Sequence, residues 1–298
     1  LRRVREMKDA NGERLGEKII RELKKLVTSR LAEREEYQGP VRRSEGDELM
    51  DPVIAHLDIT AGERDPGGYE RIHRTEQRED LFGGLDIYLL LDLSRSMAES
   101  DPVSGQVKAD LQRDFALLYA DTLMQCAFES RQSAGDLEAP LPIRLQIVSI
   151  HGDASVDLPL TDRWGPKEQV ALYDAVHAYP TGGTPDHAGL HLIEQRILQE
   201  REAWKKKTHA AHEKPPIEFV PVCLDGGSDD VHQAHNMVNR LRSGGAIVYG
   251  YGMTAAAGAI TATYAPNATV VESLAQHAES VAKDTVEVFR KMYPERVK

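Results

Sequence analysis

The chain has 298 residues, of which 41% are hydrophobic and 29% are charged, an ordinary composition for a globular protein. No apolar run approaches the roughly 18 residues of a membrane-spanning helix, and no signal peptide opens the chain, so we expect a cytoplasmic protein. The net charge of −11 is uneven: residues 1–43 carry 13 Lys/Arg and 8 Asp/Glu (+5), and the remainder carries 24 and 40 (−16). An acidic body with a basic segment disfavours a general nucleic-acid-binding protein.

Two cysteines, Cys126 and Cys223, lie in apolar runs. We expect both to be buried thiols, with neither a disulfide nor a cysteine-bound zinc ion, which fits a reducing compartment. The sequence opens with Leu1 and not Met, so we expect it to be part of a longer protein.

The first 84 residues are predicted to form two segments. Residues 16–36 have an apolar stripe at helical spacing, made by Ile20, Leu23, Val27 and Leu31, before the helix-ending pair Gly39-Pro40. We therefore expect a basic helical arm over 1–43. A charged lead-in with one short helix near 47–57 is expected over 44–84.

From residue 85 the pattern alternates between strands and helices. Strands are predicted at 85–93, 143–152, 217–227, 246–253 and 268–273, with a short edge strand at 155–160. Helices are predicted at 107–128, 166–179, 186–207, 230–245 and 273–293. This order predicts an α/β fold with a doubly wound, mainly parallel sheet and helices on both faces, over residues 85–298. Ligands of such sheets bind beyond the carboxyl ends of the strands.

Three loops near those ends carry hydroxyls and carboxylates. Asp92, Ser94 and Ser96 follow the first buried strand in a DxSxS pattern, Thr184 lies in "TGGTP", and Asp225 ends a later strand in "CLDGG". Mg²⁺ prefers hard oxygen ligands in an octahedron, and two carboxylates would balance its charge. Alternation along an extended loop lets residues i, i+2 and i+4 point the same way. The pattern predicts a divalent-cation site with one position open for a partner's carboxylate.

These motifs resemble the von Willebrand factor A (VWA) domain and its metal-ion-dependent adhesion site (MIDAS). The resemblance covers roughly residues 85–292, and upstream residues from 46 resemble the bacterial VWA proteins NorD, CbbO and CobT. It implies that Ser94, Ser96 and Thr184 bind the metal directly, and that Asp92 and Asp225 act through water. Mg²⁺ is the expected ion, with Mn²⁺ and Ca²⁺ as alternatives. The sequence departs from the family at Leu224, where many relatives have Thr.

The resemblance also implies a function. NorD, CbbO and CobT work with AAA+ ATPases of the MoxR or chelatase type, so the expected role is an adaptor between such an ATPase and a client metalloenzyme with an acidic residue at its surface. The alternative is a subunit of a cobalt or magnesium chelatase. We expect neither nucleic-acid binding nor membrane insertion.

Enzymatic alternatives fit the sequence less well. The chain has neither a GxxxxGK[ST] phosphate loop nor a GxSxG nucleophile elbow, so we expect no catalytic residues. An aspartyl phosphatase of the haloacid dehalogenase type needs a second carboxylate two residues after its nucleophile, where this chain has Ser94.

Several of these residues also have simpler structural explanations than metal binding. Asp and Ser also cap turns, and Thr184-Pro185 is a plausible helix N-cap. Asp229 and Asp230 are expected to cap the next helix, and Asp186 to be an acid of a first helical turn.

Overall fold

The computed structural model describes most of the chain. The described residues are 5–8, 12–18, 20–21, 36–41, 43, 48–49, 51–73, 81–82, 84–101, 105–132, 142–176, 180–207, 213–253, 258–271 and 274–292. The chain divides into two compact units, one made of Lys25–Glu79 and the other of Leu1–Lys24 with Asp80–Lys298. This division differs from the predicted ranges 1–43, 44–84 and 85–298, because the first 24 residues belong with the large unit.

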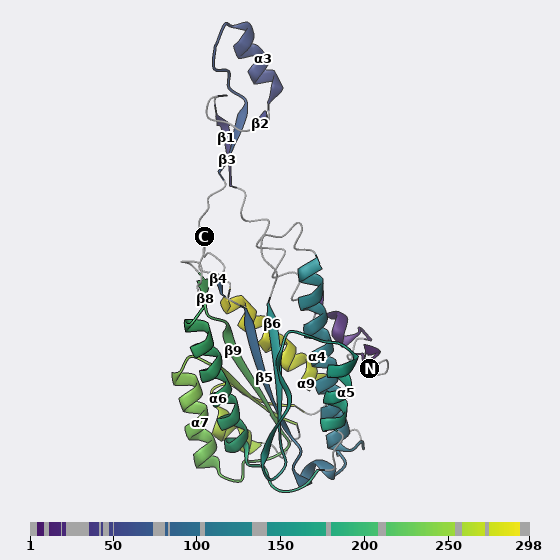
Figure 1. Cartoon of the computed structure of the whole chain (residues 1–298). Helices are drawn as coiled ribbons and strands as arrows, with labels where there is room; N and C mark the ends of the chain where they lie inside the picture. The colour runs from purple at the N-terminus through teal and green to yellow at the C-terminus, as the bar shows by residue number, and fades with distance from the viewer. Residues whose placement is uncertain are drawn as a thin grey trace. The chain divides into compact units, whose positions relative to one another are not determined.

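The large unit is built on a six-stranded sheet with strand order β11-β10-β9-β5-β6-β7 (Figure 1). Its strands are β5 (Leu85–Asp92), β6 (Ile143–Ile150), β7 (Ala154–Thr161), β9 (Ile217–Leu224), β10 (Ile247–Gly252) and β11 (Ala268–Val270). All neighbouring pairs are parallel except β6–β7, which is antiparallel. The mainly parallel sheet and the edge position of the strand after β6 are confirmed.

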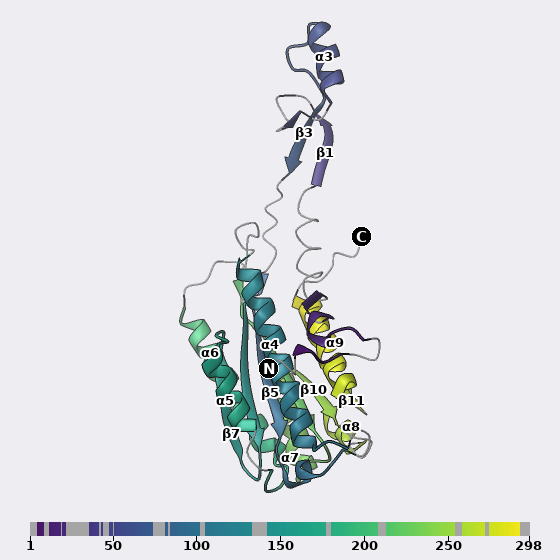
Figure 2. The same ribbon diagram turned by 90° about the vertical axis from the view of Figure 1, so that its right-hand side faces the viewer.

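Helices cover both faces of this sheet. They are α4 (Lys108–Gln132), α5 (Pro166–Val176), α6 (Asp186–Lys205), α7 (Val231–Ser243), α8 (Ala259–Tyr264) and α9 (Leu274–Met292). Helices α6 and α7 lie on one side of the sheet, and α4, α5 and α9 lie on the other (Figure 1); Figure 2 is turned so that this second group faces the viewer. The predicted doubly wound α/β architecture is therefore confirmed. Helix α8 was missed, because six residues with two threonines give little helical periodicity.

Burial explains the strand patterns. Every residue of β5 is buried, as is expected of a central parallel strand covered on both faces. One core cluster joins Leu90, Val148 and Val222 from three strands to Leu190 of α6 and Val238 of α7. The thiols of Cys126 and Cys223 are buried, as predicted, and neither is part of a disulfide bond.

The start of the chain packs onto the large unit. Leu15 is 1% exposed, and the Arg5 guanidinium donates two hydrogen bonds, at 2.7 and 2.8 Å, to the carboxylate of Asp121 in α4. Residues 15–18, 20 and 21 are helical, but 22–35 lie outside the described residues, and residue 36 begins a strand. The predicted helix 16–36 is thus wrong at its end.

The described residues of the small unit form a three-stranded sheet, β1-β3-β2, and one helix. The elements are β1 (Glu36–Val41), β2 (Glu48–Leu49), α3 (Pro52–Thr60) and β3 (Tyr69–His73). The predicted short helix exists, with Asp51 as its N-cap accepting hydrogen bonds from the amides of Val53 and Ile54. The sequence analysis predicted no strand in this unit, whereas the structure pairs β3 antiparallel with β1.

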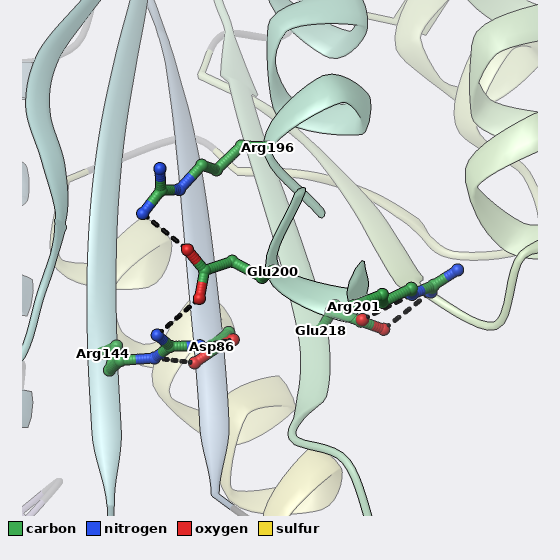
Figure 3. Close-up of polar contacts among 6 residues, drawn as sticks. All are labelled: Asp86, Arg144, Arg196, Glu200, Arg201 and Glu218. Atoms are coloured by element: carbon green, nitrogen blue, oxygen red, sulfur yellow. Dashed lines mark hydrogen bonds and ion pairs between the residues drawn. The ribbon is translucent and has the colours of Figure 1, made fainter. Parts of the chain in front are cut away.

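Ion pairs gather at the amino ends of the central strands (Figure 3). Asp86 lies beside Arg144 and Glu218 in the register of β5 with β6 and β9. Arg144 binds Asp86 at 2.6 Å and Glu200 of α6 at 2.7 Å, and Arg201 of α6 binds Glu218 at 2.8 Å. These groups border a cavity of about 210 Å³. A second short parallel pair, β4 (Leu81–Phe82) with β8 (Glu213–Lys214), completes the described strands.

Among the described residues, no helix combines the length and the apolar character that crossing a membrane requires.

Candidate metal centre

The three predicted loops meet at the carboxyl ends of β5 and β9, as the parallel sheet requires. The loop after β5 begins where Leu93 donates its amide hydrogen to Ile150 of β6. It is tied to the "TGGTP" loop by two backbone hydrogen bonds, from the Thr181 amide to the Leu93 carbonyl and from the Arg95 amide to the Gly182 carbonyl, both 3.1 Å long. These contacts fix the loops by backbone groups and leave the side chains for another role.

Serine hydroxyls and the third-loop carboxylate form a continuous chain. The Ser94 and Ser96 Oγ atoms are 3.0 Å apart, and Ser96 Oγ donates to Asp225 Oδ1 at 2.9 Å. Ser94 precedes the short 3₁₀ helix η1 (Arg95–Ala98), but its hydroxyl makes no capping hydrogen bond. The alternative that Ser94 is only a turn cap therefore does not account for its hydroxyl.

Asp92 is the most deeply buried carboxylate of the site, at 0% exposure. Its Oδ1 accepts the Ser94 amide at 2.7 Å, whereas its Oδ2 is buried and makes no hydrogen bond within the described part of the chain. Burial raises the pKa of Asp92 to about 7, against the opposing effect of hydrogen bonds from Ser94. Such a carboxylate needs a cation or a proton.

Thr184 is brought to the same place by its loop. The residue is buried, and its carbonyl accepts the Asp229 amide from the third loop. Gly182, at φ +72°, lies against Gly152 of the β6–β7 turn: a Cβ at Gly182 would come within 2.6 Å of the Gly152 Cα atom. Helix α6 starts at Asp186 with Pro185 at its N-cap and no capping side chain, so the N-cap alternative for Thr184 is not supported.

Two acidic neighbours have structural roles. Asp230 caps α7 by accepting the Gln233 amide, as predicted. Asp186 was expected to be an ordinary acid of a first turn, which is incomplete: it is fully buried and accepts hydrogen bonds from Ser228 and from Tyr264 Oη at 2.7 Å. Asp186 thus joins the start of α6 to the third loop and to α8.

Sequence reasoning missed two residues of α4. Lys108 Nζ lies 2.9 Å from Asp225 Oδ2, and Gln112 Nε2 donates to the Asp92 carbonyl at 2.5 Å. Burial alone would lower the pKa of Lys108, but the hydrogen bond and the charge of Asp225 outweigh it and raise that pKa, so the ammonium stays protonated. No local sequence motif marks these residues, because they come close to Asp225 and Asp92 only through the tertiary structure.

The donor set fits a hard divalent cation. Ligands of an octahedral Mg²⁺ lie about 2.1 Å from the ion, so neighbouring ligands are about 3.0 Å apart. The distance between the Ser94 and Ser96 Oγ atoms, 3.0 Å, matches that spacing. Among the described residues there is no group of three or more His, Cys, Asp or Glu side chains that would hold a metal ion, so this mixed set of hydroxyls and carboxylates is the candidate. The metal-ligand roles of Asp92, Ser94, Ser96, Thr184 and Asp225 stay a prediction.

No protein-family model matches the chain, and neither does any curated protein. Solved structures do resemble it. The pilus adhesin SpaC from Lactobacillus rhamnosus GG, in its open conformation, aligns with a TM-score of 0.51 and 10% identity over 69% of this chain and 30% of the adhesin.

Two further structures were solved with a metal. Proximal thread matrix protein 1 from the mussel byssus, with a zinc-occupied MIDAS motif, aligns at TM-score 0.48 and 14% identity over 71% of this chain and 46% of its own. The manganese-loaded TRAP protein of Plasmodium vivax aligns at 0.42 and 13% over 66% and 72%. The chain spans less than half the length of the matrix protein and of the adhesin. The likeness to SpaC shows a shared fold, in agreement with the doubly wound α/β fold expected from the sequence.

Proposed function

We propose that the chain is a metal-dependent protein-interaction domain of the VWA type. In this proposal one divalent cation binds to Ser94, Ser96 and Thr184, with Asp92 and Asp225 neutralising its charge. A vacant coordination position then accepts a carboxylate from a partner protein. The observation that carries the proposal is the buried Oδ2 of Asp92, which makes no hydrogen bond among the described residues, beside two hydroxyls spaced like neighbouring ligands.

The proposed biological role is that of an adaptor. Support comes from the resemblance of residues 46–97 to NorD, CbbO and CobT, which work with AAA+ ATPases of the MoxR or chelatase type. The partner would be such an ATPase, and the client a metalloprotein that presents an acidic residue. Since the body of the chain carries a net charge of −16, the cation would be the main attraction for an acidic partner.

Partner binding tests this proposal. A calorimetric titration against the cognate ATPase or client, with and without chelator, should show at least tenfold weaker binding for Ser94→Ala and Thr184→Ala, about 1.4 kcal/mol. Thr181→Ala is the matched control, because it removes an exposed hydroxyl from the same loop and leaves the Thr181 amide bonded to Leu93. Equal binding by wild type and variants, unaffected by chelator, would place the interface elsewhere.

A phosphatase of the haloacid dehalogenase type also needs a lysine near the phosphate, and the Lys108 ammonium beside Asp225 is a candidate for that group. The chain still lacks the second carboxylate, because the residue two positions after Asp92 is Ser94. We expect no hydrolysis of a generic aryl phosphate with Mg²⁺. Turnover that is lost in Asp92→Asn would favour the phosphatase instead.

A further inference from the structure

Lys108 is held at the candidate metal centre by the backbone around it. It begins α4, and its amide donates to the Glu99 carbonyl at 3.0 Å. The residues between are closed by a bridge from Ser100 to Val107 and by a 2.7 Å hydrogen bond from the Asp101 amide to the Gln106 carbonyl. Together with the hydrogen bond from Gln112 to the Asp92 carbonyl, these contacts hold the first turn of α4 beside the DxSxS loop, so backbone groups fix the position of Lys108.

The two oxygens of Asp225 are divided between two kinds of donor. Oδ1 accepts the Ser96 hydroxyl and Oδ2 binds Lys108 Nζ, both at 2.9 Å. The side chains of Asp225 and Lys108 are only 3% and 11% exposed, so solvent screens this ion pair weakly. Glu99, 3.4 Å from the same ammonium, is 72% exposed and contributes much less.

The charges of the site determine how strongly it attracts a cation and an anion. Asp92 and Asp225 together balance a divalent cation, which would leave a neutral site if no other charge were present. With the Lys108 ammonium included, the loaded site has a net charge of +1, and the empty site with both carboxylates ionised has −1. A buried positive charge of this kind repels the metal and attracts an anion.

Resting on the proposed function, we infer that Lys108 determines the specificity of this site for carboxylate groups. It gives the metal-loaded centre a net positive charge, and it weakens metal binding in doing so. The two effects have opposite signs, so one substitution should strengthen metal binding and weaken carboxylate binding. A residue that only supported the fold would not produce that combination.

The test uses the full chain, stripped with chelator, and Lys108→Gln, which keeps a hydrogen-bond donor for Asp225 and removes the charge. In a calorimetric titration, Mn²⁺ should bind to the variant at least roughly threefold more tightly than to wild type. Titrating sodium acetate into the Mn²⁺-loaded protein, followed by water-proton relaxation at constant ionic strength, should show acetate binding weaker by roughly threefold or more.

Matched variants separate charge from fold. Lys108→Arg keeps the charge and should behave like wild type, and Lys167→Gln removes an exposed lysine from the first turn of α5 and should change neither affinity. Lys108→Met repeats the test if the Gln variant loses its native circular dichroism.

If wild type binds Mn²⁺ and the neutral variants have unchanged affinity for Mn²⁺ or for acetate, the inferred role of Lys108 is wrong but the proposed function stands. No Mn²⁺ binding by wild type would overturn the proposed function as well.

Discussion

At the scale of single residues, Asp92 has the least favourable surroundings among the residues of the candidate centre. A carboxylate in an apolar interior is stable when donors or cations surround both oxygens. The described part of the chain supplies an amide for Oδ1 and no hydrogen bond for Oδ2. Burial therefore dominates and raises its pKa to about 7. The site stores a free-energy penalty that a bound cation would remove.

This penalty predicts a pH dependence for the metal-free protein. Because the folded-state pKa of Asp92 lies above its ordinary value of 3.8, the folded state holds the proton more tightly than the unfolded state. The contribution of Asp92 to the free energy of unfolding is thus largest below pH 4 and is lost as the pH rises through about 7. Mg²⁺ must displace this proton, so it should raise the thermal midpoint more at pH 8 than at pH 6.

Thermal unfolding of wild type and Asp92→Asn, with and without Mg²⁺, measures this effect. The Asn variant has no proton to lose, so it should be more stable than metal-free wild type at pH 8, and its midpoint should not respond to Mg²⁺. Equal Mg²⁺ responses of the wild type at both pH values would contradict the role of Asp92.

At the scale of helices and strands, the two ends of the sheet differ in their chemistry. The carboxyl ends carry serine hydroxyls and the Asp92 carboxylate, whose Oδ2 has no hydrogen bond among the described residues. The amino ends carry opposite charges that form ion pairs with one another. Asp86, 3% exposed, receives two hydrogen bonds from Arg144, and Glu200 of α6 binds the same guanidinium (Figure 3). This arrangement fastens the last turns of α6 to the sheet and is expected to be structural.

Replacing Arg144 by Met should therefore be costly. It removes the cation from a buried carboxylate, a change that typically costs about 3 kcal/mol or more of the free energy of unfolding. Urea unfolding measures the loss. Lys205→Met is the control, because its ion pair with Glu202 is exposed on both sides and should contribute little to the free energy of unfolding. A similar small loss in both variants would show that the Asp86 pair is dispensable.

Elements of the large unit were predictable from sequence because their patterns are strong. Strands such as β5 are continuous apolar runs, and helices α7 and α9 are strongly amphipathic. The β1–β3 pair was missed because "EYQGPV" contains a glycine and a proline, which normally interrupt strands. Lys108 was missed for another reason: it is the sixteenth residue after Asp92, and only tertiary structure returns it to Asp225.

At the scale of the whole molecule, the start of the chain is part of the large unit. A basic helical arm was predicted over residues 1–43, but residues 1–24 belong to the large unit: the Arg5 guanidinium is paired with Asp121, and Leu15 is buried. Burial would raise the pKa of Asp121, and the hydrogen bonds from Arg5 and Trp164 more than offset this, so the pKa is lowered. The pair therefore stabilises the fold above about pH 4 and loses its effect in acid.

Arg5→Ala should loosen this segment. Because the Arg5 side chain is 58% exposed, the expected loss of global stability is small, about 1 kcal/mol or less. Amide hydrogen exchange over residues 12–18 should nevertheless accelerate, since the anchor of the segment is gone. Arg14→Ala is the control, because Arg14 pairs with Glu17 in its own segment. Unchanged exchange in Arg5→Ala would mean that packing around Leu15 alone holds the segment.

The central claim is that Asp92, Ser94, Ser96, Thr184 and Asp225 bind one divalent cation. Calorimetric titration of Mn²⁺ and of Mg²⁺ into the chelator-stripped full chain tests it most directly. We predict binding of one ion per chain, at least tenfold weaker, about 1.4 kcal/mol, in Ser94→Ala and Asp225→Asn, and unchanged in Thr181→Ala. The absence of binding at millimolar concentrations of both ions, or equal binding by wild type and Ser94→Ala, would contradict the claim.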